Sequence, residues 1–285
     1  YMRLAQDSSY SFLFESVEKG TQYSRYSFLG INPKKIFIHE NKKTKIIENG
    51  IIKNSKIKFI QLLNNVINEY KTPNISDIPQ FTGGLVGYFG YETIIWNENI
   101  PVHEQDKIET PDSIFMLFED MIAFDHLKGQ VVVFSNVKID YNRPIKKQYE
   151  EAIKRINKLG EYLHRDIDYQ TPKKIISSTL HSNISKSEYI NSIKKAKQYI
   201  ESGDIFQIVL SQRFHRETTV DPINIYRALR SINPSPYMFY LNLDNFKIVG
   251  SSPELLVKVE NNEIELRPIA GTKVRGKNFD EDKKI

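Results

Sequence analysis

Two segments near the end of the chain combine residue types that could bind and transform a small acidic molecule. The first, Ser251 to Glu254, closes with a carboxylic acid, and the second, Arg267 to Lys273, contains Gly271 and Thr272. A carboxyl group can act as a general acid when burial raises its pKa. The backbone N–H of a glycine can approach an anion closely, and a threonine adds a hydroxyl. Judged by residue type alone, Glu254 is more simply explained as a surface carboxylate.

A third candidate is the proline loop, Asn233 to Pro236, which leads into Tyr237, Met238 and Phe239. Each proline fixes its own φ and restricts the preceding residue, so the loop is stiff. Adaptable aromatic and thioether side chains beside a rigid loop could bind a flat ring. On composition alone, a plain connection between a helix and a strand is the favoured interpretation.

Other familiar catalytic patterns are missing from the sequence. The glycine-rich stretch Gly83 to Tyr91 lacks the lysine and hydroxyl of a phosphate-binding loop, so it predicts a strand with close backbone approach. There is no cysteine and no Gly-x-Ser-x-Gly elbow. The histidines have no second histidine, cysteine or acid at metal-ligand spacing in the sequence; they are His39, His103, His126, His164, His181 and His215. Because the sequence has no cysteine, disulfides and thiolate–metal sites are excluded.

The composition is that of an ordinary folded protein. The 285 residues are 40% hydrophobic and 26% charged, which permits a large core. The net charge is +5, but the lysines are scattered, so nucleic-acid binding is not favoured. No apolar run of about 18 residues predicts a membrane span, and no signal-peptide pattern opens the sequence. We expect a cytoplasmic protein that binds neither membranes nor nucleic acids.

Hairpins outnumber strand–helix–strand crossovers in the pattern of expected elements. Antiparallel strands are expected over 12–53, with a hairpin turn at Asn49-Gly50, and further hairpins over 113–137, 238–250 and 255–267. A buried strand is expected over Ile205 to Phe214. Helices are expected over 55–70, 146–164, 185–203 and 221–232, the third opened by a capping box of Ser185 and Glu188. The pattern predicts an α+β fold with antiparallel sheets.

The best candidate for a linker is a polar stretch without clear periodicity at residues 166–184. It divides the chain into an amino-terminal region, residues 1–165, and a second region, residues 185–285.

The candidate segments are also where the chain resembles the chorismate-binding enzymes, specifically the anthranilate synthase component I family. The matching segments cover essentially the whole chain: Phe12 to Ser16, Arg25 to Gly30, Gly83 to Tyr91, Asp204 to Arg213, Asn233 to Phe239 and Arg267 to Thr272. The resemblance implies antiparallel sheets packed face to face with helices outside. It also implies that residues 185–285 form only the first part of a chorismate-binding domain.

The resemblance implies a reaction as well. Members of the family convert chorismate and ammonia to anthranilate and pyruvate, the first committed step of tryptophan biosynthesis, and tryptophan inhibits them. By this resemblance, Glu254 is the acid that helps the C4 hydroxyl of chorismate leave, while Gly271 and Thr272 bind chorismate. Ser16, Pro236, Tyr237 and Met238 match the residues that bind the inhibitor tryptophan.

Cofactor and partner follow from the same resemblance. Mg²⁺ is the expected cofactor, and its glutamate ligands and a histidine near the substrate are expected beyond Ile285, so we expect this chain alone to be inactive. Ammonia is expected from glutamine through a glutamine amidotransferase subunit, because a glutaminase needs a cysteine that this sequence lacks.

Three other interpretations compete with this one. Aminodeoxychorismate synthases usually carry a nucleophilic lysine where this chain has Ala270, and alanine cannot attack the ring. A chain that keeps only tryptophan binding would be a regulatory or inert module. A nucleic-acid binder rests on net charge alone, and would require a strongly salt-dependent affinity.

Overall fold

The computed structural model describes residues 1–17, 25–70, 72–73, 75–101, 108–167, 178–269, 271, 274 and 276–282. Their packing forms two compact units. One unit combines Tyr1–Tyr169 with Pro222–Pro253, and the other combines Gln170–Asp221 with Glu254–Ile285. The predicted linker at 166–184 stays a prediction, since much of it lies outside the described residues. The sequence did not indicate that Pro222–Pro253 packs with the first unit.

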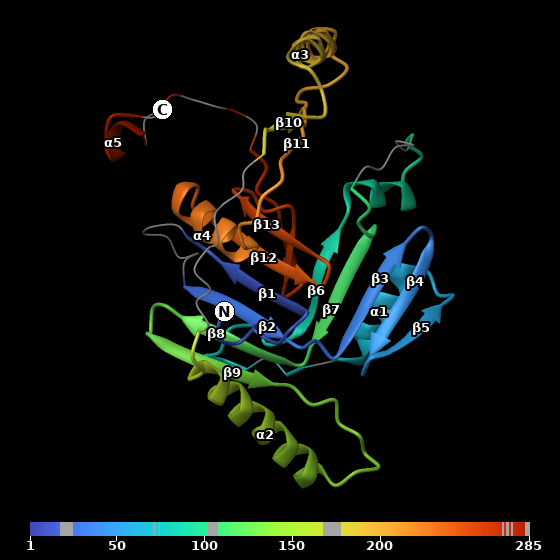
Figure 1. Cartoon of the computed structure of the whole chain (residues 1–285), viewed down its shortest axis with the longest axis vertical. Helices are drawn as coiled ribbons and strands as arrows, with labels where there is room; N and C mark the ends of the chain where they lie inside the picture. The colour runs from blue at the N-terminus through green and yellow to red at the C-terminus, as the bar shows by residue number, and fades with distance from the viewer. Residues whose placement is uncertain are drawn as a thin grey trace. The chain divides into compact units, whose positions relative to one another are not determined.

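The first unit contains two antiparallel sheets (Figure 1). The larger has the order β13-β12-β1-β2-β8-β9 and the smaller the order β5-β4-β3-β7-β6. The strands of the larger sheet are β1 (Tyr10–Glu15), β2 (Tyr26–Ile31), β8 (Asp120–Asp125), β9 (Gln130–Ser135), β12 (Tyr237–Leu243) and β13 (Phe246–Ser252). Those of the smaller are β3 (Lys35–Glu40), β4 (Lys43–Glu48), β5 (Ile51–Ser55), β6 (Gly84–Phe89) and β7 (Ser113–Phe118).

One hydrophobic core joins the two sheets. Phe12 and Leu241 from the larger sheet lie in the same buried cluster as Ile36, Ile114 and Met116 from the smaller sheet. Alternate residues of each strand face this cluster, because successive side chains of a strand point to opposite faces. The predicted α+β fold with antiparallel sheets packed face to face is confirmed.

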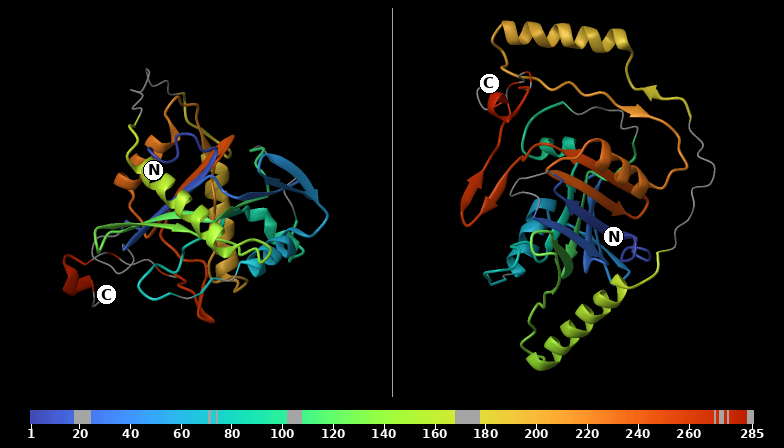
Figure 2. Two further views of the ribbon diagram at one scale, coloured as in Figure 1. Left: turned by 90° about the horizontal axis from the view of Figure 1, so that it is seen from below. Right: turned by 90° about the vertical axis from the view of Figure 1, so that its left-hand side faces the viewer.

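Helices cover the outer faces of these sheets (Figures 1 and 2). The helix α1 (Phe59–Glu69) buries Phe59, Leu63 and Val66 against Phe37 and Leu117 of the smaller sheet. The helix α2 (Ile145–Leu163) packs against β9, and α4 (Pro222–Ile232) packs against β12 and β13. The predicted helices at 55–70, 146–164 and 221–232 are confirmed. A 3₁₀ helix, η2 (Tyr91–Trp96), follows β6.

Two sequence signals that depend on glycine are also confirmed. Asn49 and Gly50 have φ values of 51° and 75°, as a tight turn between β4 and β5 requires. A Cβ atom added to Gly87 would lie 1.9 Å from the carbonyl oxygen of Ile114 on the neighbouring strand. The glycine-rich stretch is therefore a strand with close backbone approach, as predicted, and not a phosphate-binding loop.

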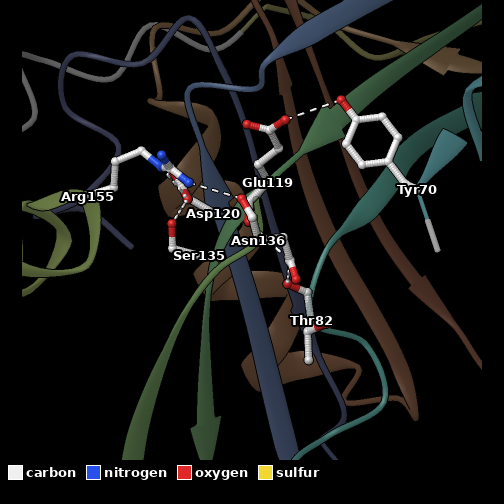
Figure 3. Close-up of polar contacts among 7 residues, drawn as sticks. All are labelled: Tyr70, Thr82, Glu119, Asp120, Ser135, Asn136 and Arg155. Carbon is white, nitrogen blue, oxygen red and sulfur yellow. Dashed lines mark hydrogen bonds and ion pairs between the residues drawn. The ribbon is translucent and has the colours of Figure 1, made fainter. Parts of the chain in front are cut away.

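The predicted hairpin over 113–137 is wrong in its first arm. The arm breaks at Glu119, and its two halves, β7 and β8, belong to different sheets, so only β8 and β9 form the hairpin. Side chains fix this crossing point (Figure 3). The amide nitrogen of Asn136 donates to the carbonyl oxygens of Thr82 and Glu119 at 2.7 and 3.1 Å. Arg155 of α2 donates to Asp120 at 3.1 Å and to the carbonyl of Asn136 at 3.0 Å.

The second unit has less regular structure. Its elements are β10 (His181–Ser182), α3 (Lys186–Glu201), β11 (Phe214–His215), β14 (Lys258–Glu260), β15 (Glu263–Glu265) and α5 (Phe279–Asp282). The predicted capping box is confirmed, since the Ser185 hydroxyl accepts from the Glu188 N–H and the Glu188 carboxylate accepts from the Ser185 N–H. The hairpin expected over 255–267 is present as β14 and β15.

The buried strand predicted over Ile205 to Phe214 is wrong. The segment has no regular structure before Phe214, and Phe206 and Val209 are 101% and 83% exposed. A strand needs a partner along its length. In this segment only Phe214, with the His215 that follows it, pairs with another described strand, β10.

Among the described helices, we find none with the length and apolar character that crossing a bilayer requires.

Candidate functional site

The end of β1 lies beside the start of β12 and the proline loop. In the antiparallel register, Glu15 is opposite Met238. The pairing continues past the strand, because the N–H of Val17 donates to the carbonyl of Ser235 at 3.0 Å. Ser16 is therefore held next to Tyr237, although more than two hundred residues separate them in the sequence. The structure brings the predicted inhibitor-binding residues together.

The hydroxyl of Ser16 is buried and has no hydrogen-bond partner among the described residues. Buried polar groups are nearly always paired, and each exception needs an explanation. A serine hydroxyl both donates and accepts, so it could bind the ammonium or the carboxylate of an amino acid. The hydroxyl is therefore available to form a hydrogen bond with a ligand at the predicted inhibitor site.

The other three predicted inhibitor-binding residues differ in their exposure. Pro236 and Tyr237 are half-buried. Met238 is 1% exposed and lies in a cluster with Tyr226 of α4 and Tyr240 of β12. Because neighbouring strand residues face opposite sides, Tyr237 points away from this cluster. Tyr237 and Pro236 can therefore form an accessible wall, whereas Met238 supports that wall from the core.

Two serine hydroxyls attach the proline loop to the end of β13. The Ser235 hydroxyl donates to the carbonyl of Ser252, and the Ser251 hydroxyl donates to the carbonyl of Asn233 at 2.7 Å. Ser235 is buried despite its polar side chain, which the first of these bonds satisfies. The loop is thus rigid through hydrogen bonds as well as through its prolines.

The predicted chorismate-binding residues lie in the second unit and are less enclosed. Glu254 is exposed, and one of its carboxylate oxygens accepts from the N–H of Ile269 at 3.2 Å. This bond joins the segment of Glu254 to the segment that leads to Gly271. Gly271 is exposed, with no atom within 4 Å of the position of a Cβ. Thr272 lies outside the described residues.

A group of three side chains beside Ser16, the Glu15 cluster, could not be predicted from the sequence; it consists of Glu15, Tyr226 and Arg230. The carboxylate of Glu15 accepts from the hydroxyl of Tyr226 at 2.6 Å and from Nε of Arg230 at 3.1 Å. Burial, together with the hydrogen bond to Glu15, raises the pKa of Tyr226, so its hydroxyl remains a donor at neutral pH. The only sequence signal for this cluster is that Tyr226 and Arg230 are four residues apart on a predicted helix. No sequence pattern near either residue indicates that they contact Glu15.

The described residues do not provide a metal site. No group of three or more histidine, cysteine, aspartate or glutamate residues could hold an ion in that part of the chain. Two histidines that are distant in the sequence lie together, because His181 of β10 and His215 of β11 stack with ring centroids 5.3 Å apart. Two concave surfaces lie elsewhere, one along the β14–β15 hairpin and one near Tyr10 and Asn32, and neither includes a predicted site residue.

The fold and the paired segments define the class of the protein. The chain belongs to the family described as chorismate binding enzyme, which matches residues 9–285. It is 40% identical to anthranilate synthase component 1 of Acetivibrio thermocellus, over 98% of this chain and 58% of that relative. It is also 40% identical to the probable anthranilate synthase component 1 of Schizosaccharomyces pombe, over 99% of this chain and 55% of that relative.

A solved structure supports the same assignment. Anthranilate synthase component I from Streptococcus pneumoniae has a TM-score of 0.69 and 30% sequence identity, covering 87% of this chain and 54% of that one. The family and fold predicted from the sequence are confirmed. The chain spans little more than half the length of the relatives that it matches.

Proposed function

We propose that this chain forms the front part of an anthranilate synthase large subunit, which converts chorismate and ammonia to anthranilate, pyruvate and water. The observation that carries the proposal is the meeting of Ser16 with Pro236 and Tyr237 at a buried hydroxyl that has no partner among the described residues. Proteins named anthranilate synthase component 1 that are 40% identical to this chain over 98–99% of its length support it. The product would be the first committed intermediate of tryptophan biosynthesis.

In this proposal Glu254 is the acid of the reaction. Ammonia adds at C2 of chorismate, the C4 hydroxyl leaves as water after receiving a proton, and pyruvate is then eliminated. The hydrogen bond from Ile269 directs the Glu254 carboxyl toward the segment of Gly271, where the substrate would bind. Glu254 is exposed here, so it would act as the acid once bound substrate encloses it. The backbone N–H of Gly271 would contact a substrate carboxylate.

The inhibitor is proposed to be tryptophan, bound at the Ser16 hydroxyl between Pro236 and Tyr237. Its indole ring would lie against the half-buried Tyr237, and its amino or carboxylate group would bond the hydroxyl. This would make the first unit the regulatory part of the enzyme.

Mg²⁺ and a glutamine amidotransferase subunit complete the proposal. Mg²⁺ would hold the substrate carboxylate, and the described residues contain no cluster of metal ligands for it. A chain covering 55–58% of its relatives is expected to make no anthranilate by itself. The amidotransferase subunit would supply ammonia, because this chain has no cysteine to attack glutamine.

The alternative is an aminodeoxychorismate synthase, and one residue separates the two functions. Ala270 replaces the lysine nucleophile expected in that enzyme, although its position lies outside the described residues. The relatives named above also favour anthranilate synthase.

The test is anthranilate fluorescence from the purified product of the complete gene, supplied with chorismate, ammonium and Mg²⁺. We expect anthranilate to form, tryptophan to suppress it, and glutamine to replace ammonium only when the amidotransferase subunit is added. An aminodeoxychorismate product would overturn the proposed reaction. Anthranilate formation that tryptophan does not affect would overturn the inhibitor site alone.

A further inference from the structure

The end of β1 is held by a pair of donors from α4. Tyr226 and Arg230 both donate to the same oxygen of Glu15, at 2.6 and 3.1 Å. They are four residues apart, so they project from one face of the helix. The Tyr226 residue is 2% exposed and the Glu15 side chain 15% exposed, whereas the guanidinium-bearing side chain of Arg230 is 47% exposed. The carboxylate is therefore mostly shielded from solvent, whereas Arg230 remains largely exposed.

Glu15 is the residue directly before the unpaired hydroxyl of Ser16. On the other side of Ser16, the N–H of Val17 is fixed by the carbonyl of Ser235. Ser16 thus lies between two anchored neighbours, one attached to α4 and the other attached to the proline loop. Its own side chain is left without a partner among the described residues. A binding group whose backbone is fixed on both sides loses little conformational freedom when a ligand arrives.

A purely stabilising role explains the Glu15 cluster less well. Enclosing a carboxylate costs hydration energy, which an ion pair often only offsets, so such clusters are weak contributors to stability. An apolar side chain at position 15, combined with phenylalanine at position 226, would pack against Ile223 and Met238 without that cost. The two charge-assisted hydrogen bonds instead fix the position of Glu15, the last residue of β1, relative to α4.

We propose that Tyr226 and Arg230 are positioning residues of the inhibitor site, which act through Glu15 to fix the Ser16 hydroxyl for an amino-acid ligand. The inference rests on the proposed tryptophan site and adds to it two residues from α4. Arg230 has a second effect, because its positive charge offsets the negative charge of Glu15. Glu15 therefore does not repel the carboxylate of an amino acid from the Ser16 hydroxyl. Neither residue needs to touch the ligand.

The test compares Arg230→Gln and Tyr226→Phe with Arg230→Lys and with a matched control, Arg227→Gln. Arg227 is on the same helix and bonds Asn224, so the control removes an equal charge without touching Glu15. For each variant of the complete gene product, calorimetric titration gives the dissociation constant of tryptophan. The tryptophan concentration that halves anthranilate formation is measured relative to the uninhibited rate of the same variant, and thermal unfolding is followed without ligand.

We expect Arg230→Gln and Tyr226→Phe to weaken tryptophan binding by about tenfold, as loss of one positioned hydrogen bond would. Arg230→Lys should restore part of the affinity, and Arg227→Gln should match the unsubstituted protein. Wild-type affinity in Arg230→Gln would overturn the positioning role while leaving the inhibitor site intact. A lowered unfolding temperature with unchanged affinity would assign the cluster to stability alone. If the unsubstituted protein does not bind tryptophan, the proposed inhibitor site itself fails.

Discussion

Two regions predicted to take part in function differ in how far their own packing fixes them. At the end of β1, Ser16 lies between anchored neighbours, and Met238 beneath it is 1% exposed. In the second unit, Glu254 and Gly271 are exposed, and a hydrogen bond from Ile269 joins their segments. The contrast teaches that the tertiary packing of the first unit fixes the proposed inhibitor site. The proposed catalytic segment, by contrast, is exposed.

The largest expected effect is on catalysis. Replacing Glu254 by glutamine removes the proton but keeps the shape, so kcat/KM for chorismate should fall by about 10²–10⁴-fold. Unfolding by urea should hardly change, because the side chain is exposed. Anthranilate fluorescence from the complete gene product measures the first effect. Glu263→Gln, at an exposed carboxylate of β15, is the control, and an equal loss of activity in that variant would remove the special role of Glu254.

Core substitutions test the contrast in packing directly. Met238→Ala empties space beneath the proposed inhibitor site and should lower the free energy of unfolding by about 2–5 kcal/mol. Leu256→Ala, in the second unit, removes a side chain that is 86% exposed and should cost less than about 0.5 kcal/mol. Urea unfolding measures both. Equal costs would mean that Leu256 is buried in solution and that the two regions are packed alike.

Local chemistry explains which parts of the fold could be predicted from the sequence. The turn at Asn49-Gly50 and the capping box of Ser185 and Glu188 depend on neighbouring residues only, so their sequence signals are sufficient. Helix α1 was equally predictable, because its apolar residues recur at helical spacing. Strand assignments failed where the outcome depends on a distant partner. The segment at 205–214 is apolar enough for a strand, but the described chain offers no partner for most of it.

The candidate site shows the same limit. Nothing in the spacing of Ser16 and Pro236 predicts that they meet, and only the family resemblance suggested it. The role of Tyr226 and Arg230 depends on α4 packing beside β1, which is a property of the three-dimensional fold. Glu254 and Gly271 were recognised as a pair of segments from their residue types, but their exposure could not be read from the sequence.

A smaller effect is expected from the cap of α3 in the second unit. This helix buries only Ala196, so its stability comes mainly from local interactions. Ser185→Ala removes the side chain that accepts from the Glu188 N–H and should destabilise the helix by about 1 kcal/mol. Amide hydrogen exchange in residues 186–201 should accelerate, while exchange in β1 and β12 should not change. Ser192→Ala, in the middle of the helix, is the control, and equal acceleration in both variants would show that the cap is not responsible.

The smallest effect concerns a carboxylate that the first unit holds tightly. Arg25 donates to Asp125 through Nη2 at 2.9 Å, and the N–H groups of Leu127 and Lys128 donate to it at 3.1 Å. The hydrogen bond from Arg25 is the main cause that lowers the pKa of Asp125 from 3.8 to about 2. A carboxyl whose pKa is depressed in the folded state stabilises the protein fully above its unfolded pKa, and this stabilisation is lost as the pH falls through the folded pKa.

The stabilisation from Asp125 should therefore disappear between about pH 4 and pH 2. Over that interval, Asp125→Asn should lose stability less steeply than the unsubstituted protein, as measured by urea midpoints at successive pH values. Asp7→Asn is the matched control, because Asp7 also pairs with an arginine, Arg165 at 2.9 Å, but its side chain is 80% exposed. Its curve should follow that of the unsubstituted protein, since exposed ion pairs contribute little. Parallel curves for all three proteins would show that the ion pair of Arg25 and Asp125 does not contribute to stability in this pH range.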